Sequence, residues 1–148
     1  MLEVLVLRHG QSVADLENRH EGRADFPLTE LGREQARLAG GWIAANCPPA
    51  AVVSSPLKRA SETALLVGGA CGLPVVFDEG LMEFNNGALA GLLFEEADRL
   101  YPLAEGGRPP HERVPGGESL LEFRFRKRAL SGSFAAGRTG LMIVRVGD

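Results

Sequence analysis

Short apolar runs alternate with amphipathic stretches along the 148-residue chain. The first run, VLVL at residues 4–7, lacks the alternation of a half-exposed strand and predicts a short strand buried on both faces. Three later runs predict further strands, at residues 50–55 (AAVVSS), 73–78 (LPVVFD) and 140–146 (GLMIVRV).

Amphipathic stretches separate the first three of these runs and predict two helices. Thr29 can cap the first helix, which NCPP ends, and its apolar positions recur at helical spacing: Leu31, Leu38, Ala39, Trp42 and Ile43. The second helix is expected to have Ser55 as N-cap, Pro56 at the first position and Gly72 near its end. Its expected apolar face comprises Leu57, Ala60, Ala64 and Leu65.

Strands that alternate with helices predict an α/β domain with a parallel or mostly parallel sheet. Residues 17–29 mix Gly, Asp and Pro with charges and predict a loop. Residues 101–119 are rich in Pro and Gly and predict a long irregular insertion, which is typical of a substrate-facing lid or of a solvated loop.

The composition is ordinary for a globular protein, with 45% hydrophobic and 24% charged residues and a net charge of -3. This balance argues against nucleic acid or an anionic membrane as partners. The first residues carry no basic region and too short an apolar run for a signal peptide, so we expect a cytoplasmic protein. Cys47 and Cys71 are expected to act as small hydrophobic side chains, and the three histidines lack metal-ligand spacing.

Charged and titratable residues follow the first three predicted strands. Arg8 and His9 follow the first strand directly, Arg59 falls in the first turn of the helix after the second, and Glu83 follows the third. Because the carboxyl ends of parallel strands meet at one edge of a sheet, these side chains are expected to converge there. Arg8 and Arg59 are suited to clamp phosphate oxygens.

His9, placed between two guanidinium groups, is expected to stay neutral and to direct a lone pair at phosphorus. Glu83, beside a bound dianion, could hold the proton that a departing alkoxide needs, so the set requires no metal ion and no cofactor. Each of these residues alone also fits a plainer role, as a solvated side chain or a backbone-bonded histidine. Their conjunction after successive strands is what favours phosphoryl chemistry.

These residues resemble the histidine phosphatase superfamily, which has the phosphoglycerate mutase-like fold. The similarity runs in the family's order through LRHGQS, EGRADFPLTELGREQA, SSPLKRASETA, LMEFNNGALAG and PGGES, from about residue 2 to residue 123. The resemblance implies one domain over residues 1–148, with three α/β/α layers. It also implies that His9 accepts the phosphoryl group, that Arg8 and Arg59 bind it, and that Glu83 is the general acid.

Other family positions are only partly matched. Gln11, Ser12 and Gly22 match the rim of the family's phosphate pocket. Asp15 stands where many members carry Asn, and we leave it out of the expected site because a carboxylate there would repel phosphate.

The last predicted strand departs from the family pattern, which places Ser or Ala, His and Gly after an apolar run. Here Arg145, Val146 and Gly147 follow, so Val146 stands at the position of the missing second His. Arg145 is one position away and would point to the opposite face of a strand, so reduced activity is expected. The chain stops at Asp148, where members usually continue. A degenerate site, a truncated or frameshifted product and a partial chain are the open explanations.

The leading expectation is a metal-independent hydrolase that acts on a small phosphorylated substrate through a phosphohistidine. A phosphoglycerate mutase-type transferase is the alternative among enzymes. A phosphate-binding or regulatory module is the alternative outside enzymes, and Val146 favours it. Sugar phosphates, nucleoside-derived phosphates and phosphoproteins all stay open as substrates, and an unfinished sheet would expose an edge that invites a homodimer.

Overall fold

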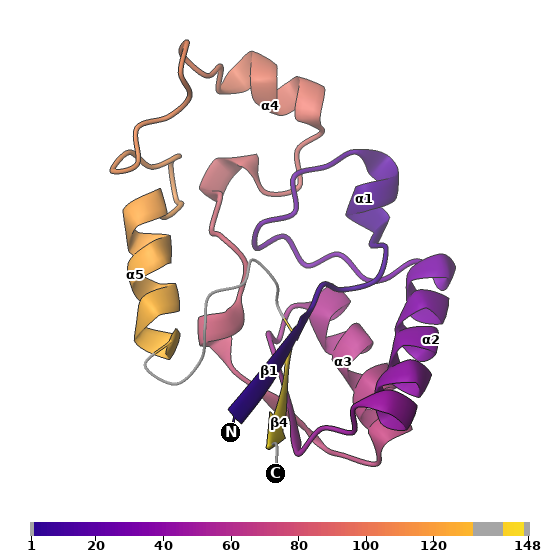
Figure 1. The fold of residues 1–148 in the computed structure, drawn as a ribbon. Helices are drawn as coiled ribbons and strands as arrows, with labels where there is room; N and C mark the ends of the chain where they lie inside the picture. Colours follow the sequence, from indigo (N-terminus) through magenta and orange to yellow (C-terminus); the bar gives the residue numbers. More distant parts are fainter. Residues whose placement is uncertain (1, 132–140, 147–148) are drawn as a thin grey trace.

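The computed structural model describes residues 2–131 and 141–146 (Figure 1). It contains one sheet in the order β1-β4-β2-β3, whose strands are β1 (Leu2–Leu7), β2 (Ala51–Ser54), β3 (Val75–Phe77) and β4 (Leu141–Val146). β2 and β3 pair in parallel, whereas β4 pairs antiparallel with both β1 and β2. β1, β2 and β3 therefore run in the predicted common direction, and β4 opposes them.

Helices lie on both sides of this sheet, which confirms the expected α/β/α layers. α2 (Glu30–Asn46) packs on α3 (Lys58–Cys71) on one side, and α5 (Leu120–Ser131) lies on the other side (Figure 1). Four short elements occupy the connections: α1 (Val13–Glu17), η1 (Glu79–Leu81), η2 (Gly87–Leu89) and α4 (Phe94–Leu100). No helix within the described ranges is long and apolar enough to cross a membrane.

The core is divided between the two faces of the sheet. Val52 of β2 packs with Ile43, Ala64 and Val67 of the α2–α3 layer, and the partly buried Cys47 and Cys71 join this cluster as the expected small hydrophobic side chains. The neighbours of Val52 along β2 point to the other face, where Leu81 of η1 packs against Val4, Ala51 and Val53. This alternation is the ordinary period of a strand covered on both faces.

β1 differs from the prediction of a strand buried on both faces. Leu5 and Val6 are 38% and 40% exposed, because β1 lies at an edge of the sheet. An uninterrupted apolar run does not distinguish a central strand from an edge strand whose side chains are only partly covered.

α2 begins as predicted, with the Thr29 hydroxyl accepting a hydrogen bond from the Gly32 N–H at 3.0 Å. Its buried face consists of Gly32, Ala36, Gly40 and Ile43. Of the apolar positions in the predicted pattern, Ile43 is thus buried, whereas Leu31, Leu38 and Trp42 are more than half exposed. A Cβ atom on Gly40 would lie 3.0 Å from the Val67 Cα, so the contact with α3 admits only small residues. The helix was predicted correctly, and its predicted apolar positions coincide only in part with its buried face.

α3 begins slightly later than predicted. Leu57 is the N-cap and Lys58 the first helical residue, whereas Ser55 lies upstream and its hydroxyl accepts the N–H of Leu57 at 3.2 Å. Gly72 ends the helix in the left-handed conformation, as expected. Leu57, Ala60 and Ala64 are buried as predicted, and Leu65 is 57% exposed.

Candidate active site

The turn after β1 is held by backbone packing against α2 and α3. A Cβ atom on Gly10 would lie 2.2 Å from the carbonyl oxygen of Gly32, so only glycine fits at this point. The Gly10 N–H donates to the Thr63 hydroxyl of α3 at 3.2 Å. Thr63 is itself buried and donates to the carbonyl of Arg59 at 2.7 Å. The turn that presents His9 is therefore tied to the helix that carries Arg59.

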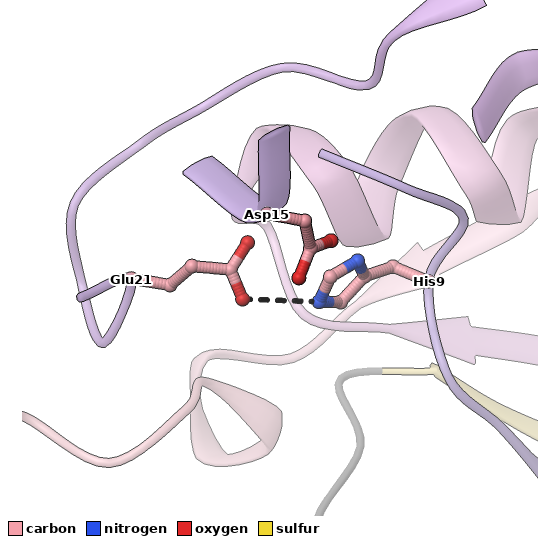
Figure 2. A group of neighbouring side chains, drawn as sticks. All are labelled: His9, Asp15 and Glu21. Atoms are coloured by element: carbon pink, nitrogen blue, oxygen red, sulfur yellow. Dashed lines mark ion pairs between the residues drawn. The ribbon is translucent and has the colours of Figure 1, made fainter. Parts of the chain in front are cut away.

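His9 is fixed through one ring nitrogen. Its Nδ1 lies 2.7 Å from the carbonyl oxygen of Gly10, which can only accept, so Nδ1 carries a proton. Nε2 is then the nitrogen that carries the lone pair of a neutral imidazole. It faces the carboxylate of Glu21, with 3.4 Å between Nε2 and Oε2 (Figure 2).

Glu21 is the charged group on which the site converges. Its Oε1 lies 3.4 Å from the Arg59 Nε and also accepts a hydrogen bond from the Ser12 hydroxyl. Burial raises the pKa of the Glu21 carboxyl, but the contact with the His9 ring, the hydrogen bond from Ser12 and the charge of Arg59 outweigh burial. The pKa of Glu21 is therefore below its ordinary value of 4.5, and the group is an anion at neutral pH.

Arg59 lies at the start of α3, as predicted, and its side chain is only 3% exposed. Its two terminal nitrogens donate to the carbonyl oxygens of Gly22 at 2.8 Å and Ala24 at 3.0 Å. Gly22 adopts a positive φ of 51°, and a Cβ atom there would collide with the Asn86 side chain. The loop between α1 and α2 thus wraps the guanidinium and leaves its Nε facing Glu21.

Arg8 does not share this buried environment. Its side chain is 59% exposed, and its guanidinium donates to Asp15 Oδ1 at 3.0 Å. Asp15 also accepts the Ser12 N–H, while Ser12 caps α1. Burial raises the pKa of Asp15, but these donors and the charge of Arg8 bring it below 3.8. Asp15, which was left out of the expected site because of its charge, lies near His9 and pairs with Arg8.

The predicted rim residues have divided roles. Gln11 accepts a hydrogen bond from the Thr29 hydroxyl through its side-chain oxygen at 2.8 Å, so it helps to join the turn after β1 to α2. Ser12 is fully buried and its hydroxyl donates to Glu21.

Glu83 follows β3 and η1, and its segment is held in place by α5. Its carboxylate accepts the N–H of Phe84 at 2.7 Å. The Arg126 guanidinium donates to the carbonyl oxygens of Gly80, Met82 and Glu83 at 2.8, 3.0 and 3.3 Å. The basic end of α5 is thus a docking contact for the Glu83 segment. Proton donation by Glu83 stays a prediction.

Val146 does not lie at this edge of the sheet. It pairs with Leu2 at the start of β1, whereas Leu141 pairs with Leu7, next to Arg8 and His9. Five residues of strand place the Val146 position about 17 Å from the site end of β1. The assignment of Val146 to the position of a second site histidine stays a prediction, and this backbone register does not favour it.

Nitrogen and oxygen donors gather closely enough to consider a metal ion. One ligand atom each from His9, Asp15 and Glu21 lie within 4.8 Å of one another, and Figure 2 shows the three side chains pointing toward a common centre. Such donors suit Zn²⁺. Each carboxylate, however, already has an arginine and a Ser12 donor as partners, so an ion would have to compete with them.

Sequence reasoning missed Glu21, Thr63 and Arg126. The pattern offered one signal for Glu21, because it directly precedes Gly22, a predicted rim residue. Thr63 falls one helical turn after Arg59, on the same face, and could have been found by that spacing. Arg126 carried no signal beyond its charge.

Comparison with known proteins supports the resemblance to the histidine phosphatase superfamily. The family model described as Histidine phosphatase superfamily (branch 1) matches residues 4–146. The chain is 37% identical to the bifunctional protein Rv2228c of Mycobacterium tuberculosis, over 97% of this chain and 40% of that protein. It is 40% identical to 2,3-bisphosphoglycerate-dependent phosphoglycerate mutase 2 of Gloeobacter violaceus, over 85% of this chain and 60% of that protein.

Solved structures show the same similarity. The native structure of the mycobacterial glucosyl-3-phosphoglycerate phosphatase superposes with a TM-score of 0.76 at 35% identity, over 89% of this chain and 63% of that chain. The chain spans less than two thirds of the length of each of these three proteins.

Proposed function

Because the chain belongs to the histidine phosphatase superfamily, we propose that it hydrolyses phosphate monoesters through a phosphohistidine on His9. The observation that carries the proposal is the state of His9. Its Nδ1 is bound to the Gly10 carbonyl, and its Nε2 faces the same point as the buried Arg59 guanidinium. A nucleophile and a cation aimed at one point suit a reaction at phosphorus.

The proposed reaction has two displacements. In the first, Nε2 of His9 forms a bond to phosphorus, the bond from phosphorus to the ester oxygen breaks, and Glu83 protonates the departing oxygen. In the second, water attacks phosphorus, Glu83 takes up its proton, and the phosphorus–nitrogen bond breaks to return His9 and inorganic phosphate. Arg59 stabilises the charge on the phosphoryl oxygens in both steps, and Arg8 assists from the rim. No metal ion takes part.

Two names among the similar proteins suggest the first substrates to test. One is a phosphoglycerate mutase and another is a glucosyl-3-phosphoglycerate phosphatase. Phosphate esters of glyceric acid are therefore the natural starting set. Transfer of the phosphoryl group between positions of such a substrate is the second candidate activity, supported by the 40% identity to the mutase. Release of inorganic phosphate distinguishes hydrolysis from transfer.

The test is phosphate release from an aryl phosphate ester in the presence of a metal chelator. The parent protein should release phosphate at the same rate with and without the chelator. His9→Ala should lower the rate by about a thousandfold or more, because it removes the nucleophile. His111→Ala, which changes a histidine in the insertion 101–119, is the matched control and should retain the parent rate. Hydrolysis that survives His9→Ala, or that the chelator abolishes, would contradict the proposal.

A further inference from the structure

The Glu21 carboxylate lies between the two groups that the proposed reaction needs free. Its Oε2 is 3.4 Å from the nucleophilic nitrogen of His9, and its Oε1 is 3.4 Å from the Nε of Arg59. Its side chain is 17% exposed, and the Ser12 hydroxyl supplies a further donor. The carboxylate therefore bridges a histidine and an arginine in the way that a bound oxyanion would.

The position of this carboxylate conflicts with catalysis. For attack on phosphorus, the reacting atoms must approach to about 3–3.5 Å along the Nε2 lone pair. Glu21 Oε2 already stands at that separation from Nε2. A proton on Nε2 would bridge the two groups, whereas the lone pair that attack requires would face a lone pair of the carboxylate. The contact between His9 and Glu21 and the nucleophilic form of His9 thus exclude each other.

We propose that Glu21 is an internal competitor of the substrate, a carboxylate that occupies the anion position between His9 and Arg59 until a phosphoryl group displaces it. The inference rests on the proposed function, since it concerns the same anion position. It identifies Glu21 as a residue that sets phosphate affinity, and the ligand that displaces it is the dianionic phosphate of a monoester.

The surroundings of Glu21 allow this displacement. Arg59 remains hydrogen-bonded to the Gly22 and Ala24 carbonyls when the carboxylate leaves, so its position does not depend on Glu21. Ser12 keeps its backbone bond to Asp15, and its hydroxyl is then available to a phosphate oxygen. Phosphate can therefore replace the Glu21 carboxylate while the donors, Arg59 and Ser12, stay in place.

Two other roles for Glu21 fit these observations less well. A general acid must hold a proton at the working pH, whereas the Glu21 pKa lies below its ordinary value. A fixed counter-ion for Arg59 would be expected to make the shortest contacts to the guanidinium, yet those go to the carbonyls of Gly22 and Ala24 at 2.8 and 3.0 Å.

The size of the effect follows from the occupancy of the anion position. If the carboxylate occupies it in about nine of ten molecules, the apparent phosphate affinity is lowered about tenfold. Glu21→Gln keeps the shape of the side chain and removes the charge. The variant should therefore bind inorganic phosphate at least about tenfold more tightly than the parent.

The experiment is calorimetric titration of inorganic phosphate into the parent protein, Glu21→Gln and Glu34→Gln, with a chelator present. Glu34 lies on α2, and its carboxylate is 56% exposed and paired with Arg37, so its variant changes the net charge equally without touching the site. Tighter binding in Glu21→Gln, with Glu34→Gln unchanged, is the expected result. Equal or weaker binding in Glu21→Gln would overturn the proposal. If Glu21→Gln does not fold, Glu21→Ala replaces it, with the same two outcomes.

Kinetics with an aryl phosphate separate this inference from the proposed function. Glu21→Gln should lower KM by a similar factor and leave kcat within about twofold, because the change acts on ground-state competition. If Glu21→Gln binds phosphate more tightly but neither protein hydrolyses esters, the role of Glu21 as a competitor is supported and the proposed phosphatase activity is contradicted. If hydrolysis requires His9 but Glu21→Gln does not change phosphate affinity, the proposed phosphatase activity is supported and the role of Glu21 as a competitor is contradicted.

Discussion

Arg59 is a buried cation whose guanidinium is contacted on several sides. Its side chain is 3% exposed, both terminal nitrogens donate to loop carbonyls, and Nε faces Glu21. Removing such a group leaves carbonyl oxygens and a partly buried carboxylate without their partner, which is costlier than losing a surface ion pair. Stability and the proposed phosphate binding are therefore expected to depend on the same side chain.

Arg59→Met should lower the free energy of unfolding by about 3 kcal/mol and abolish phosphate binding. Arg37→Met is the control. Arg37 is 53% exposed and pairs with Glu34 on the surface of α2, so its loss should change stability by less than about 0.5 kcal/mol. Urea denaturation of the three proteins measures the difference. An Arg59→Met protein as stable as Arg37→Met would show that Arg59 is not held as described.

Sequence reasoning at this scale succeeded for residues at strand ends and failed for residues in loops. Arg8, His9 and Arg59 were placed correctly because a strand end or a first helical turn fixes where a side chain emerges. Glu21 comes from a loop that reaches the site through its own bonds, and no periodicity predicts that path. Asp15 was excluded on charge, because the neutralising contact with Arg8 is invisible in the sequence.

At the scale of the elements, close packing of backbone explains the order of the site. Gly10 and Gly32 meet without room for a Cβ atom, so α2 begins directly against the turn that carries His9. α3 adds the bond from Gly10 to Thr63, and α5 holds the Glu83 segment through Arg126. Each candidate residue is thus supported by an element other than its own.

The direction of β4 decides whether Val146 can contribute to the site. Because Val146 pairs with Leu2, an imidazole at this position would lie far from His9, and Val146→His should leave the rate of phosphate release unchanged. The same aryl phosphate assay measures it. A rise of about tenfold or more would be typical of an added electrostatic donor and would contradict the antiparallel pairing of β4 with β1.

The bounds of the helices were predicted better than the side of each helix that is buried. Thr29 was correctly predicted to cap the start of α2, and Gly72 to end α3. Both predictions succeeded because capping and left-handed termination depend on local chemistry. Leu38 and Trp42 belong to the predicted apolar pattern yet are exposed, because apolar spacing does not reveal that α2 meets α3 through glycine and alanine. The direction of a strand likewise cannot be predicted from a six-residue apolar run.

At the scale of the whole molecule, folding stability depends on carboxylates whose ionised form is stabilised in the folded state. Asp15, Glu21 and Glu118 all have pKa values below their ordinary ones, because donors such as Arg8, His9 and Arg126 outweigh the effect of burial. A lowered pKa in the folded state favours folding above the unfolded pKa. That contribution is lost as the pH falls through the folded value.

The melting temperature should therefore fall steeply below about pH 4.5, with these groups contributing fully above it. Glu118→Gln should reduce this dependence, because Glu118 accepts hydrogen bonds from Arg126 and from the Asn85 N–H. Thermal unfolding followed by circular dichroism at a series of pH values measures both effects. Identical pH profiles for the parent and Glu118→Gln would contradict the role assigned to this carboxylate.

The most direct test of the central claim is to trap the phosphorylated protein during turnover of an aryl phosphate and locate the phosphoryl group by mass spectrometry at neutral to alkaline pH, where phosphohistidine survives. The account predicts one acid-labile phosphoryl group on His9 Nε2, and none in His9→Ala. Turnover without a phosphorylated His9, or a phosphoryl group on another residue, would contradict it.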